Sequence, residues 1–303
     1  MSGFTAADVP PLHGRTALVT GANTGIGYCA AEVMAAMGAR VLLGCRDHAR
    51  AAAARNRILQ ALPYADIAWL PLDLADLASV RRAAEVVSKE PRLDLLVNNA
   101  GVMRPPLRHT ADGFELQFGV NHLGHFALAG LLLKKLGGPD PRIVTVASIA
   151  HRRGRIDFDN LDGAKGYDAT RFYAQSKLAN LVFALELDRR LRAAGSPVKS
   201  IACHPGLAGT ELGRNGIDKL AFRMAGLLFN SSAQGAWPTL QAATEPAAQS
   251  GEYFGPQGIG ETRGKSGPAR PSDHARDAQL GRRLWDVSVE MTGVDPGLAP
   301  ASA

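Results

Sequence analysis

The stretch Thr16-Ala17-Leu18-Val19-Thr20-Gly21-Ala22-Asn23-Thr24-Gly25-Ile26-Gly27 decides the fold. Its first half is a short apolar run that predicts a buried strand, and an apolar pattern with helical spacing begins at Ile26. Three glycines lie between the two. A strand, a glycine turn and a helix open a dinucleotide-binding fold, because the turn must approach a pyrophosphate that the helix N-terminus then holds.

The glycine spacing is Gly-x-x-x-Gly-x-Gly, which differs from the usual Gly-x-Gly-x-x-Gly. Taken alone, the element could also be a structural glycine-rich turn without a ligand. If it binds a dinucleotide, the contacts come from the turn itself: Gly21, Asn23, Thr24, Gly25, Ile26 and Gly27.

Length and composition indicate one large α/β domain over residues 1–303, since 303 residues with 46% apolar content can bury a sizeable core. The net charge of +6 comes from 34 basic and 28 acidic residues that are interspersed. The densest basic cluster, Arg152, Arg153 and Arg155, is too short for a phosphate-binding stripe, so we expect no nucleic-acid partner.

Three scattered cysteines, Cys29, Cys45 and Cys203, have neither metal-ligand spacing nor an even count, so we expect no metal site and a reducing compartment. Residues 1–14 form a polar lead-in without the apolar core of a signal peptide. Because no run of 18 apolar residues occurs, we expect no transmembrane segment and a cytoplasmic protein.

Predicted strands and helices alternate along the chain, which is typical of βαβ units. This rhythm predicts a single doubly wound Rossmann domain whose mostly parallel sheet has about seven strands flanked by helices. We expect a continuous helix over 114–136, a loop over 255–271, a last helix over 273–291 and a flexible tail over 293–303.

Polar residues follow four of the predicted strands at the point where each strand ends: Gly21, Asn98, Ser148 and His204. Ligands of an open parallel sheet sit outside the carboxyl ends of its strands. These residues are therefore expected to meet at one crevice.

Tyr173 and Lys177 lie four residues apart on a predicted helix and so project from one face. A tyrosine with a reference pKa near 10 is a poor base, but a nearby ammonium favours the phenolate and makes it a usable general acid or base. Taken alone, the Tyr-x-x-x-Lys spacing is so common that a surface Tyr and Lys on an amphipathic helix is the better interpretation of the pair.

The complete set of motifs resembles the short-chain dehydrogenase/reductase family, in the family's order over about 15–215: Thr20–Gly27, Asn98-Asn99-Ala100-Gly101, Asn121, Ser148, Tyr173-x-x-x-Lys177 and His204-Pro205-Gly206. Further stretches resemble its retinol-dehydrogenase-like branch: Asp112–Glu115, Val120–Phe126, Ser176–Asn180 and Arg283–Ser288.

The resemblance implies catalytic roles for four residues. Tyr173 would be the general acid in carbonyl reduction and the base in alcohol oxidation. Ser148 would hydrogen-bond the substrate oxygen. Lys177 would hold the nicotinamide ribose and lower the pKa of Tyr173, and Asn121 would hold a water that links Lys177 to solvent.

The resemblance also implies cofactor contacts beyond the glycine turn. Asn98, Ala100 and Gly101 would line the cleft, and Pro205 and Gly206 would pass the carboxamide end of the nicotinamide. Asp73, with Leu74 beside it, would contact the adenine; the alternative is that Asp73 caps the following helix.

The end of the second strand bears on the choice between NADP and NAD. The position where an NAD enzyme of the family carries an acidic residue is Cys45, and Arg46 follows, as suits a 2′-phosphate. Asp47 lies about 20 residues beyond Gly27, where an NAD contact is expected, but it could simply cap the next helix. We expect NADP, with NAD possible.

Residues 210–230 are expected to close over the substrate as a lid. Their apolar residues suggest an apolar alcohol, aldehyde or ketone, although ordinary core packing explains them equally well: Leu212, Ile217, Leu220, Phe222, Met224, Leu227, Leu228 and Phe229. Met103 and Leu207 are further pocket candidates, and His125 and His151 are expected to be structural.

The loop between Ser148 and Tyr173 is longer than in compact members of the family, and it could block their association interface. Both a monomer and a homodimer remain open. The alternative to an oxidoreductase is a dinucleotide-sensing or scaffold protein of the same fold, which would not need the proton-transfer residues.

Overall fold

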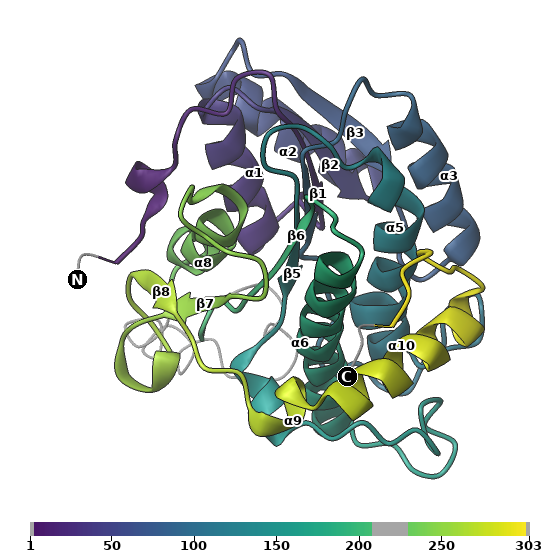
Figure 1. The fold of residues 1–303 in the computed structure, drawn as a ribbon. Helices are drawn as coiled ribbons and strands as arrows, with labels where there is room; N and C mark the ends of the chain where they lie inside the picture. The colour runs from purple at the N-terminus through teal and green to yellow at the C-terminus, as the bar shows by residue number, and fades with distance from the viewer. Residues whose placement is uncertain (1–2, 208–229, 301–303) are drawn as a thin grey trace, which may run out of the picture.

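A parallel sheet forms the centre of the computed structural model, which describes residues 3–207 and 230–300 (Figure 1). Its eight strands have the order β3-β2-β1-β4-β5-β6-β7-β8. All neighbouring pairs from β3 to β7 are parallel, and β8 is antiparallel to β7. The strands are β1 Thr16–Thr20, β2 Arg40–Cys45, β3 Ile67–Pro71, β4 Leu95–Asn98, β5 Arg142–Val146, β6 Lys199–Cys203, β7 Tyr253–Pro256 and β8 Ser266–Pro268.

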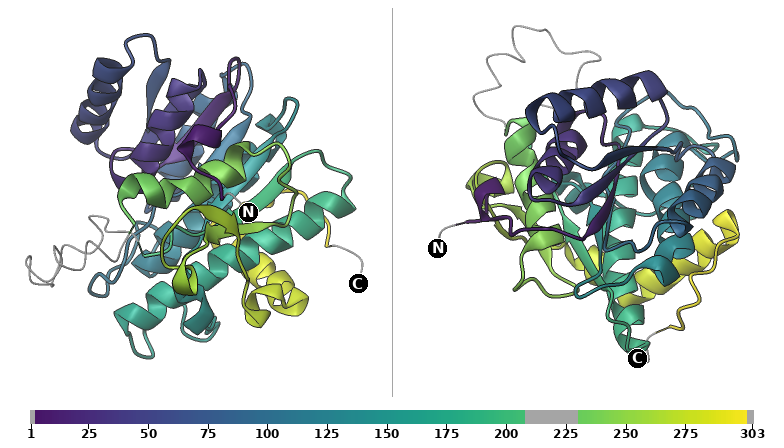
Figure 2. Two further views of the ribbon diagram at one scale, coloured as in Figure 1. Left: turned by 90° about the vertical axis from the view of Figure 1, so that its left-hand side faces the viewer. Right: turned by 90° about the horizontal axis from the view of Figure 1, so that it is seen from above.

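Helices cover both faces of this sheet, which confirms the doubly wound α/β fold (Figures 1 and 2). Successive residues of a strand face opposite sides, so Val19 joins the core under one helix layer and Leu18 the core under the other. The first layer is α1 Gly25–Ala36, α2 His48–Ala61 and α8 Ser232–Thr244. The second is α3 Leu77–Ser88, α5 Gly124–Leu132, α6 Ala169–Ala193 and α10 Ala278–Thr292.

The topological switch point lies between β1 and β4. From β1 the chain runs outward through β2 and β3, and it then returns to add β4 on the other side. In open α/β sheets, ligands bind outside the carboxyl ends of the strands beside such a point. The glycine turn and Asn98 are therefore placed at the ligand-binding edge of the sheet.

The predicted helix over 114–136 is continuous but not regular. It begins as α4 Leu116–Phe118, widens into the π-helix η2 Gly119–Leu123, continues as α5 and ends in the 3₁₀ turn η3 Leu133–Lys135. Within the described part of the chain, Leu116–Lys135 is long and apolar enough to cross a membrane, yet 78% of its most apolar window is buried inside the protein. Its packing is that of a core helix.

The C-terminal region differs from prediction in three places. The expected loop over 255–271 contains β8, because its backbone groups pair with β7. The last helix is interrupted at Asp277, which separates α9 Asp273–Arg276 from α10 and caps α10. Residues 293–300 are not an unattached tail: Val294 is buried, and the carbonyl of Leu298 accepts a hydrogen bond from Arg190.

The N-terminal lead-in is also part of the fold. Phe4 pairs with Ser266 of β8 through two backbone hydrogen bonds of 2.8 and 3.0 Å. Val9 and Leu12 are buried in the same core as α1, and the 3₁₀ turn η1 Ala6–Asp8 lies between Phe4 and Val9. The polar segment therefore covers the edge of the sheet.

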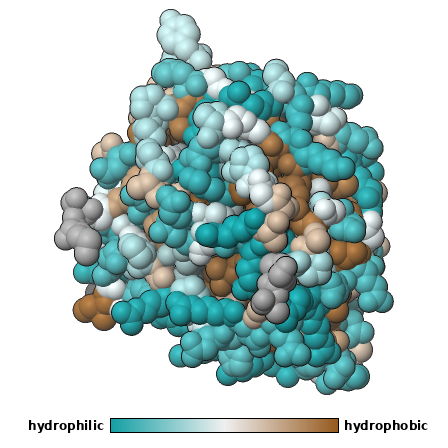
Figure 3. Space-filling view, viewed as in Figure 1, coloured by the Kyte–Doolittle hydropathy of each residue, from teal (hydrophilic) through white to brown (hydrophobic). Residues whose placement is uncertain are grey.

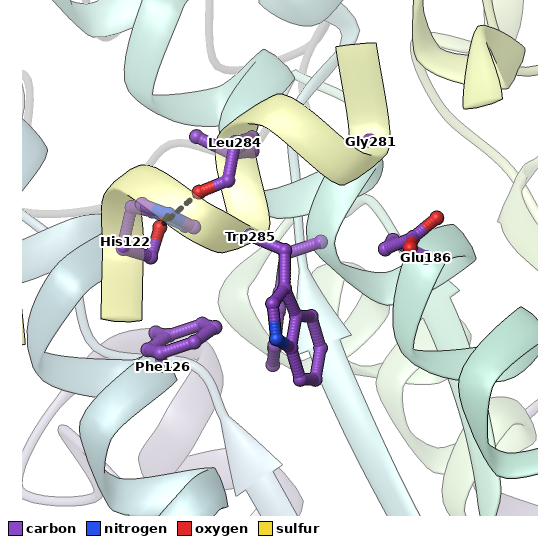
Figure 4. Close-up of a pocket in the computed structure, with 8 residues that line it drawn as sticks. His122, Phe126, Glu186, Gly281, Leu284 and Trp285 are labelled. Carbon is purple, nitrogen blue, oxygen red and sulfur yellow. Dashed lines mark hydrogen bonds between the residues drawn. The ribbon is translucent and has the colours of Figure 1, made fainter. Parts of the chain in front are cut away.

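Helix α10 packs on α5 and α6 through aromatic side chains (Figure 4). Trp285 meets Phe126 and Phe183 at ring-centroid distances of 5.2 and 6.2 Å. His122 of η2 is fully buried beside them, and burial lowers its pKa to about 3. The hollow that these residues line has no room for a water molecule, so this contact is structural.

Candidate functional site

The glycine turn joins β1 to α1. Gly21 and Gly25 have φ values of +67° and +59°, a region that residues with a side chain rarely adopt. Thr24 is the N-cap of α1 but makes no side-chain cap hydrogen bond. The first N–H groups of α1 are thus left without a capping side chain, at the place where an anion would bind.

Thr20, the last residue of β1, connects the glycine turn to the segment after β4. Its hydroxyl accepts the backbone N–H groups of Asn99 and Ala100, both at 2.9 Å, and its carbonyl accepts the side-chain amide of Asn99 at 2.8 Å. Asn98 is fully buried, and neither its side-chain nitrogen nor its oxygen has a partner in the described structure.

Ser148 and Tyr173 come together from separate elements. Ser148 begins the 3₁₀ turn η4 Ile149–Arg153 and accepts the N–H of Ala150 at 3.2 Å. Tyr173 lies in the first turns of α6, and its side chain is close enough to that of Ser148 for the serine to influence its pKa. Burial raises the pKa of Tyr173, while Ser148 and the charge of Arg104 lower it in part. The net direction is upward, so the phenol is protonated at neutral pH.

Lys177 lies one turn further along α6, as the spacing predicted. Its side chain is buried, and Nζ donates to the carbonyl of Val146 at 3.1 Å. A Cβ added to Gly101 would lie 3.5 Å from this nitrogen, so Lys177 faces the segment after β4. Burial lowers the pKa of Lys177 to about 8. The ammonium is not among the groups that lower the pKa of Tyr173, contrary to expectation.

Asn121 lies in the π-helix and holds the segment after β4. Its side chain accepts the N–H of Val102 at 2.8 Å, donates to the carbonyl of Val102 at 3.0 Å and donates to Ser176 at 2.9 Å. The side chain of Asn121 is thus hydrogen-bonded to Val102 and Ser176 of the protein itself. The predicted water held by Asn121 stays a prediction.

His125 makes contacts that the sequence did not indicate. Its Nδ1 lies 2.9 Å from the carbonyl of Asn121 and its Nε2 lies 2.9 Å from the hydroxyl of Thr20. A carbonyl only accepts, so Nδ1 carries the hydrogen and Nε2 accepts from Thr20. Burial lowers the pKa of His125 to about 4, and the ring is neutral. This agrees with a structural role.

Cys45 ends β2, and Arg46 and Asp47 follow it. Cys45 is buried, and burial raises its thiol pKa to about 12. Arg46 is exposed and has no side-chain partner among the described residues. Asp47 accepts the N–H of Arg50 at 2.9 Å and is the N-cap of α2, so its alternative role as a cap is confirmed.

Asp73 and Leu74 follow β3 at the same edge of the sheet. The Asp73 carboxylate accepts the N–H of Ala75 at 2.9 Å, whereas the N-cap of α3 is Asp76. The suggestion that Asp73 caps this helix is therefore wrong, and its contact with adenine stays a prediction. Leu74 is buried against Gly124 of α5.

Beyond β6, Pro205 and Gly206 are half-buried, and Gly206 has a φ of +73°. A Cβ on Gly206 would collide with the backbone of Thr262, so only glycine fits. Met103 is half-buried, and Leu207 is exposed. Of the segment 210–230 that was expected to form a lid, residues 210–229 lie outside the described structure.

Arg104 is a residue that the sequence did not single out. It has a φ of +53°, one of two left-handed residues other than glycine in the described structure. Its N–H donates to the side chain of Gln117 at 2.8 Å, and Gln117 is anchored by Tyr167 at 3.0 Å. The clamped loop keeps the Arg104 charge near Tyr173.

These features fit a nicotinamide dinucleotide. The α1 N-terminus, which has no capping side chain, suits the pyrophosphate, the exposed Arg46 suits a ribose phosphate, and Lys177 beside Gly101 suits the second ribose. The buried amide of Asn98, whose side-chain atoms have no partner in the described structure, ends β4 at the same edge of the sheet. The face of the molecule shown in Figure 3 is mostly hydrophilic, with hydrophobic side chains in smaller groups.

Comparison with known proteins gives consistent matches. The sequence model described as short chain dehydrogenase matches residues 15–220. The chain is 41% identical to retinol dehydrogenase 14 of Mus musculus, over 93% of this chain and 87% of that protein. It is 42% identical to retinol dehydrogenase 13 of Homo sapiens, over 97% and 89% of the two chains.

Two solved structures agree with these matches. An uncharacterised protein from Mycobacterium paratuberculosis has a TM-score of 0.83 at 38% identity and covers 98% of this chain and all of its own. A short chain dehydrogenase from Burkholderia cenocepacia, solved in complex with NADP, has a TM-score of 0.64 at 28% identity and covers 80% of this chain and 96% of its own.

Proposed function

The chain belongs to the short-chain dehydrogenase family and is an oxidoreductase that acts on alcohols or carbonyl compounds with NAD(P); we propose that it prefers NADP(H) and an apolar substrate. The observation that carries the proposal is the proximity of the Ser148 and Tyr173 side chains, with Lys177 one helical turn away facing Gly101. Proton transfer and ribose binding need these groups at one end of one crevice.

In the proposed reaction, Tyr173 donates its phenolic proton to the carbonyl oxygen during reduction and takes it back during oxidation. A nicotinamide held in the site would supply the hydride for reduction or accept it in oxidation. The hydroxyl of Ser148 donates a hydrogen bond to the same oxygen and stabilises the charge that develops there. The raised pKa of Tyr173 keeps the proton in place for reduction.

Lys177 is proposed to bind the nicotinamide ribose and Asn121 to continue the proton path through a water. With a pKa of about 8, Lys177 is mostly protonated at pH 7 and can donate to ribose hydroxyls. The free N–H groups at the α1 N-terminus would hold the pyrophosphate. Pro205 and Gly206 would lie beside the carboxamide end of the nicotinamide.

The preference for NADP(H) rests on Arg46. Its guanidinium is exposed beside the uncharged Cys45, while Asp47 is engaged in capping α2. A guanidinium binds a 2′-phosphate bidentately. The neighbour from Burkholderia cenocepacia was solved with NADP, which supports the same cofactor.

The proposed substrate class is an apolar alcohol with its aldehyde or ketone, such as a retinoid. The names of the retinol dehydrogenase relatives support it. We further propose a cytoplasmic location, in keeping with the free thiols of Cys29, Cys45 and Cys203, and a monomer or homodimer, which light scattering of the purified protein would distinguish.

Fluorescence titration with NADPH and NADH tests the proposal. NADPH should bind more tightly, and Arg46→Met should weaken NADPH by about tenfold or more while leaving NADH unchanged, the effect of one charge-assisted bond to phosphate. Equal binding of both cofactors would contradict the role of Arg46. Tyr173→Phe should bind NADPH but lose retinal reduction; retained turnover would remove Tyr173 from the mechanism.

A further inference from the structure

Two loops meet beside the proposed nicotinamide site. One is His204–Leu207, which follows β6. The other, residues 257–265, joins β7 to β8 and contains the 3₁₀ turn η6 Ile259–Glu261. The N–H of Leu207 donates to the carbonyl of Thr262 at 2.8 Å. This backbone contact places the C-terminal loop directly against the segment that contains Pro205 and Gly206.

A single carboxylate, that of Glu261, joins the two loops through side chains. His204 Nε2 lies 2.9 Å from Glu261 Oε2. The other ring nitrogen, Nδ1, accepts the N–H of Gly206 at 3.2 Å. An acceptor at Nδ1 means that Nε2 carries the hydrogen and donates to Glu261. His204 therefore transmits the position of Glu261 to the backbone of Gly206.

The same oxygen of Glu261 binds a second element. Arg152 Nη2 lies 2.7 Å from it, and Arg152 belongs to η4, the turn that Ser148 begins. Burial raises the pKa of Glu261, but the bonds to His204 and Arg152 outweigh it and lower that pKa below its usual value. Glu261 is thus ionised at neutral pH.

The turn η4, which Ser148 begins, makes a second contact with the C-terminal segment through His151. His151 Nδ1 lies 2.7 Å from the carbonyl of Ser148, and its Nε2 accepts the N–H of Ser272 at 3.2 Å. The ring of Tyr253 contacts both histidines, with centroids 5.7 Å from His151 and 5.3 Å from His204. The proposed catalytic serine and the nicotinamide loop therefore share one packed support.

The backbone of Glu261 is held in an unfavourable conformation. Its φ is +58°, a value that residues other than Gly, Asn and Asp seldom adopt. Glycine would be the easier residue at this position, and the neighbouring Gly260 has a similar φ of +62°. Such strain persists where the surrounding structure requires the side chain. Here the described contacts of that side chain are His204 and Arg152.

We propose that Glu261 is a positioning residue of the active site: by binding His204 and Arg152 with one carboxylate, it fixes the His204–Gly206 loop relative to Ser148. The inference rests on the proposed function, because it assigns Ser148 to the substrate oxygen and Pro205 and Gly206 to the nicotinamide. Glu261 touches neither reacting group and acts through the two residues that it holds.

The test compares Glu261→Ala, Glu261→Gln and Arg152→Met with the control Glu252→Gln. Glu252 lies on the same C-terminal segment, and its carboxylate accepts only the nearby N–H of Gln249 at 2.8 Å among the described bonds. Each variant is measured for NADPH affinity by fluorescence, for kcat and KM with retinal, and for thermal unfolding.

Glu261→Ala should lower kcat and weaken NADPH by about tenfold each, since small displacements of reacting groups have large effects on rate. Glu261→Gln still accepts from His204, so it should recover most of the NADPH affinity. The control should match the wild type. A kcat and NADPH affinity within twofold of wild type for Glu261→Ala would overturn the proposal.

If Glu261 had only a structural role, Glu261→Ala would lower the unfolding temperature without changing kcat of the folded enzyme. That result would also overturn the proposal. If Glu261→Ala does not fold, Arg152→Met decides, because it removes only the contact to η4 and should lower kcat more than NADPH affinity. A wild type that neither binds NADPH nor reduces retinal would overturn the proposed function together with this inference. An active wild type with unchanged variants would overturn the inference alone.

Discussion

Replacing Gly27 with alanine tests whether the glycine turn is as tight as a dinucleotide site requires. Gly27 lies in the first turn of α1. A Cβ there would lie 2.6 Å from the carbonyl oxygen of Gly21 and closer still to the side-chain amide of Asn99. The carbonyl is backbone and cannot rotate away, and the amide is itself bound to the carbonyl of Thr20 at 2.8 Å.

The expected loss of stability follows from these two contacts. Inserting a methyl group into a closely packed site costs about 1–3 kcal/mol, and losing the hydrogen bond between Asn99 and Thr20 costs about 0.5–1.5 kcal/mol. We therefore expect the free energy of unfolding to fall by about 2–4 kcal/mol. Because the start of α1 moves, NADPH should bind at least about tenfold more weakly, or about 1.4 kcal/mol.

Urea unfolding and NADPH titration measure both effects. The matched control is Gly137→Ala, because the nearest atoms to a Cβ there are those of the Arg92 side chain at 3.9 Å. It should change the free energy of unfolding by no more than about 0.5 kcal/mol. If Gly27→Ala unfolds and binds NADPH like the wild type, the close approach of turn and helix is wrong. An equal loss in the control would show that the effect is not specific.

Three further substitutions test other parts of the structure. Arg104→Met should raise the pKa of Tyr173, because the guanidinium lowers it. Alcohol oxidation needs the phenolate, so its rate at pH 8 should fall about 1.5- to 5-fold, as expected for the loss of an exposed charge. An unchanged pH–rate profile would contradict this prediction. His125→Leu leaves the buried carbonyl of Asn121 without its partner, so it should lower the free energy of unfolding by about 1–3 kcal/mol; a wild-type urea midpoint would count against the contact. Arg142→Met leaves two carbonyls near the end of α8 without the guanidinium that binds them, so it should lower the free energy of unfolding by about 2–4 kcal/mol and leave kcat unchanged. A reduced kcat in the folded variant would show that the substitution also disturbs the active site.

Local features of the sequence were enough to predict much of the fold. The glycine turn is recognisable because its left-handed residues and close approaches admit only glycine, and Gly21 and Gly25 have such φ values. The alternation of strands and helices is read from residues three or four positions apart. The pairing of Tyr173 with Lys177 follows in the same way from the pitch of one helix.

Two of the incorrect predictions involve contacts between residues that are distant along the chain, and a third involves a local helix cap. Val294 is apolar but follows Gly293 after the last helix, and nothing near it shows that it packs on the core of α5. β8 exists because β7 offers an unpaired edge. Asp277 interrupts the last helix where the periodicity of that segment predicted continuity.

The sequence by itself determined the fold class and the edge of the sheet at which the glycine turn and Asn98 lie, because those signals depend on short-range backbone geometry. The proposed catalytic residues were named from the resemblance to a family. Only the tertiary structure decided how the residues act on one another. Burial, rather than Lys177, sets the direction of the Tyr173 pKa. The contact between Glu261 and His204, 57 positions apart, has no local pattern, because electrostatic and hydrogen-bond energies depend on distance in space and on desolvation, which exist only once the chain is folded.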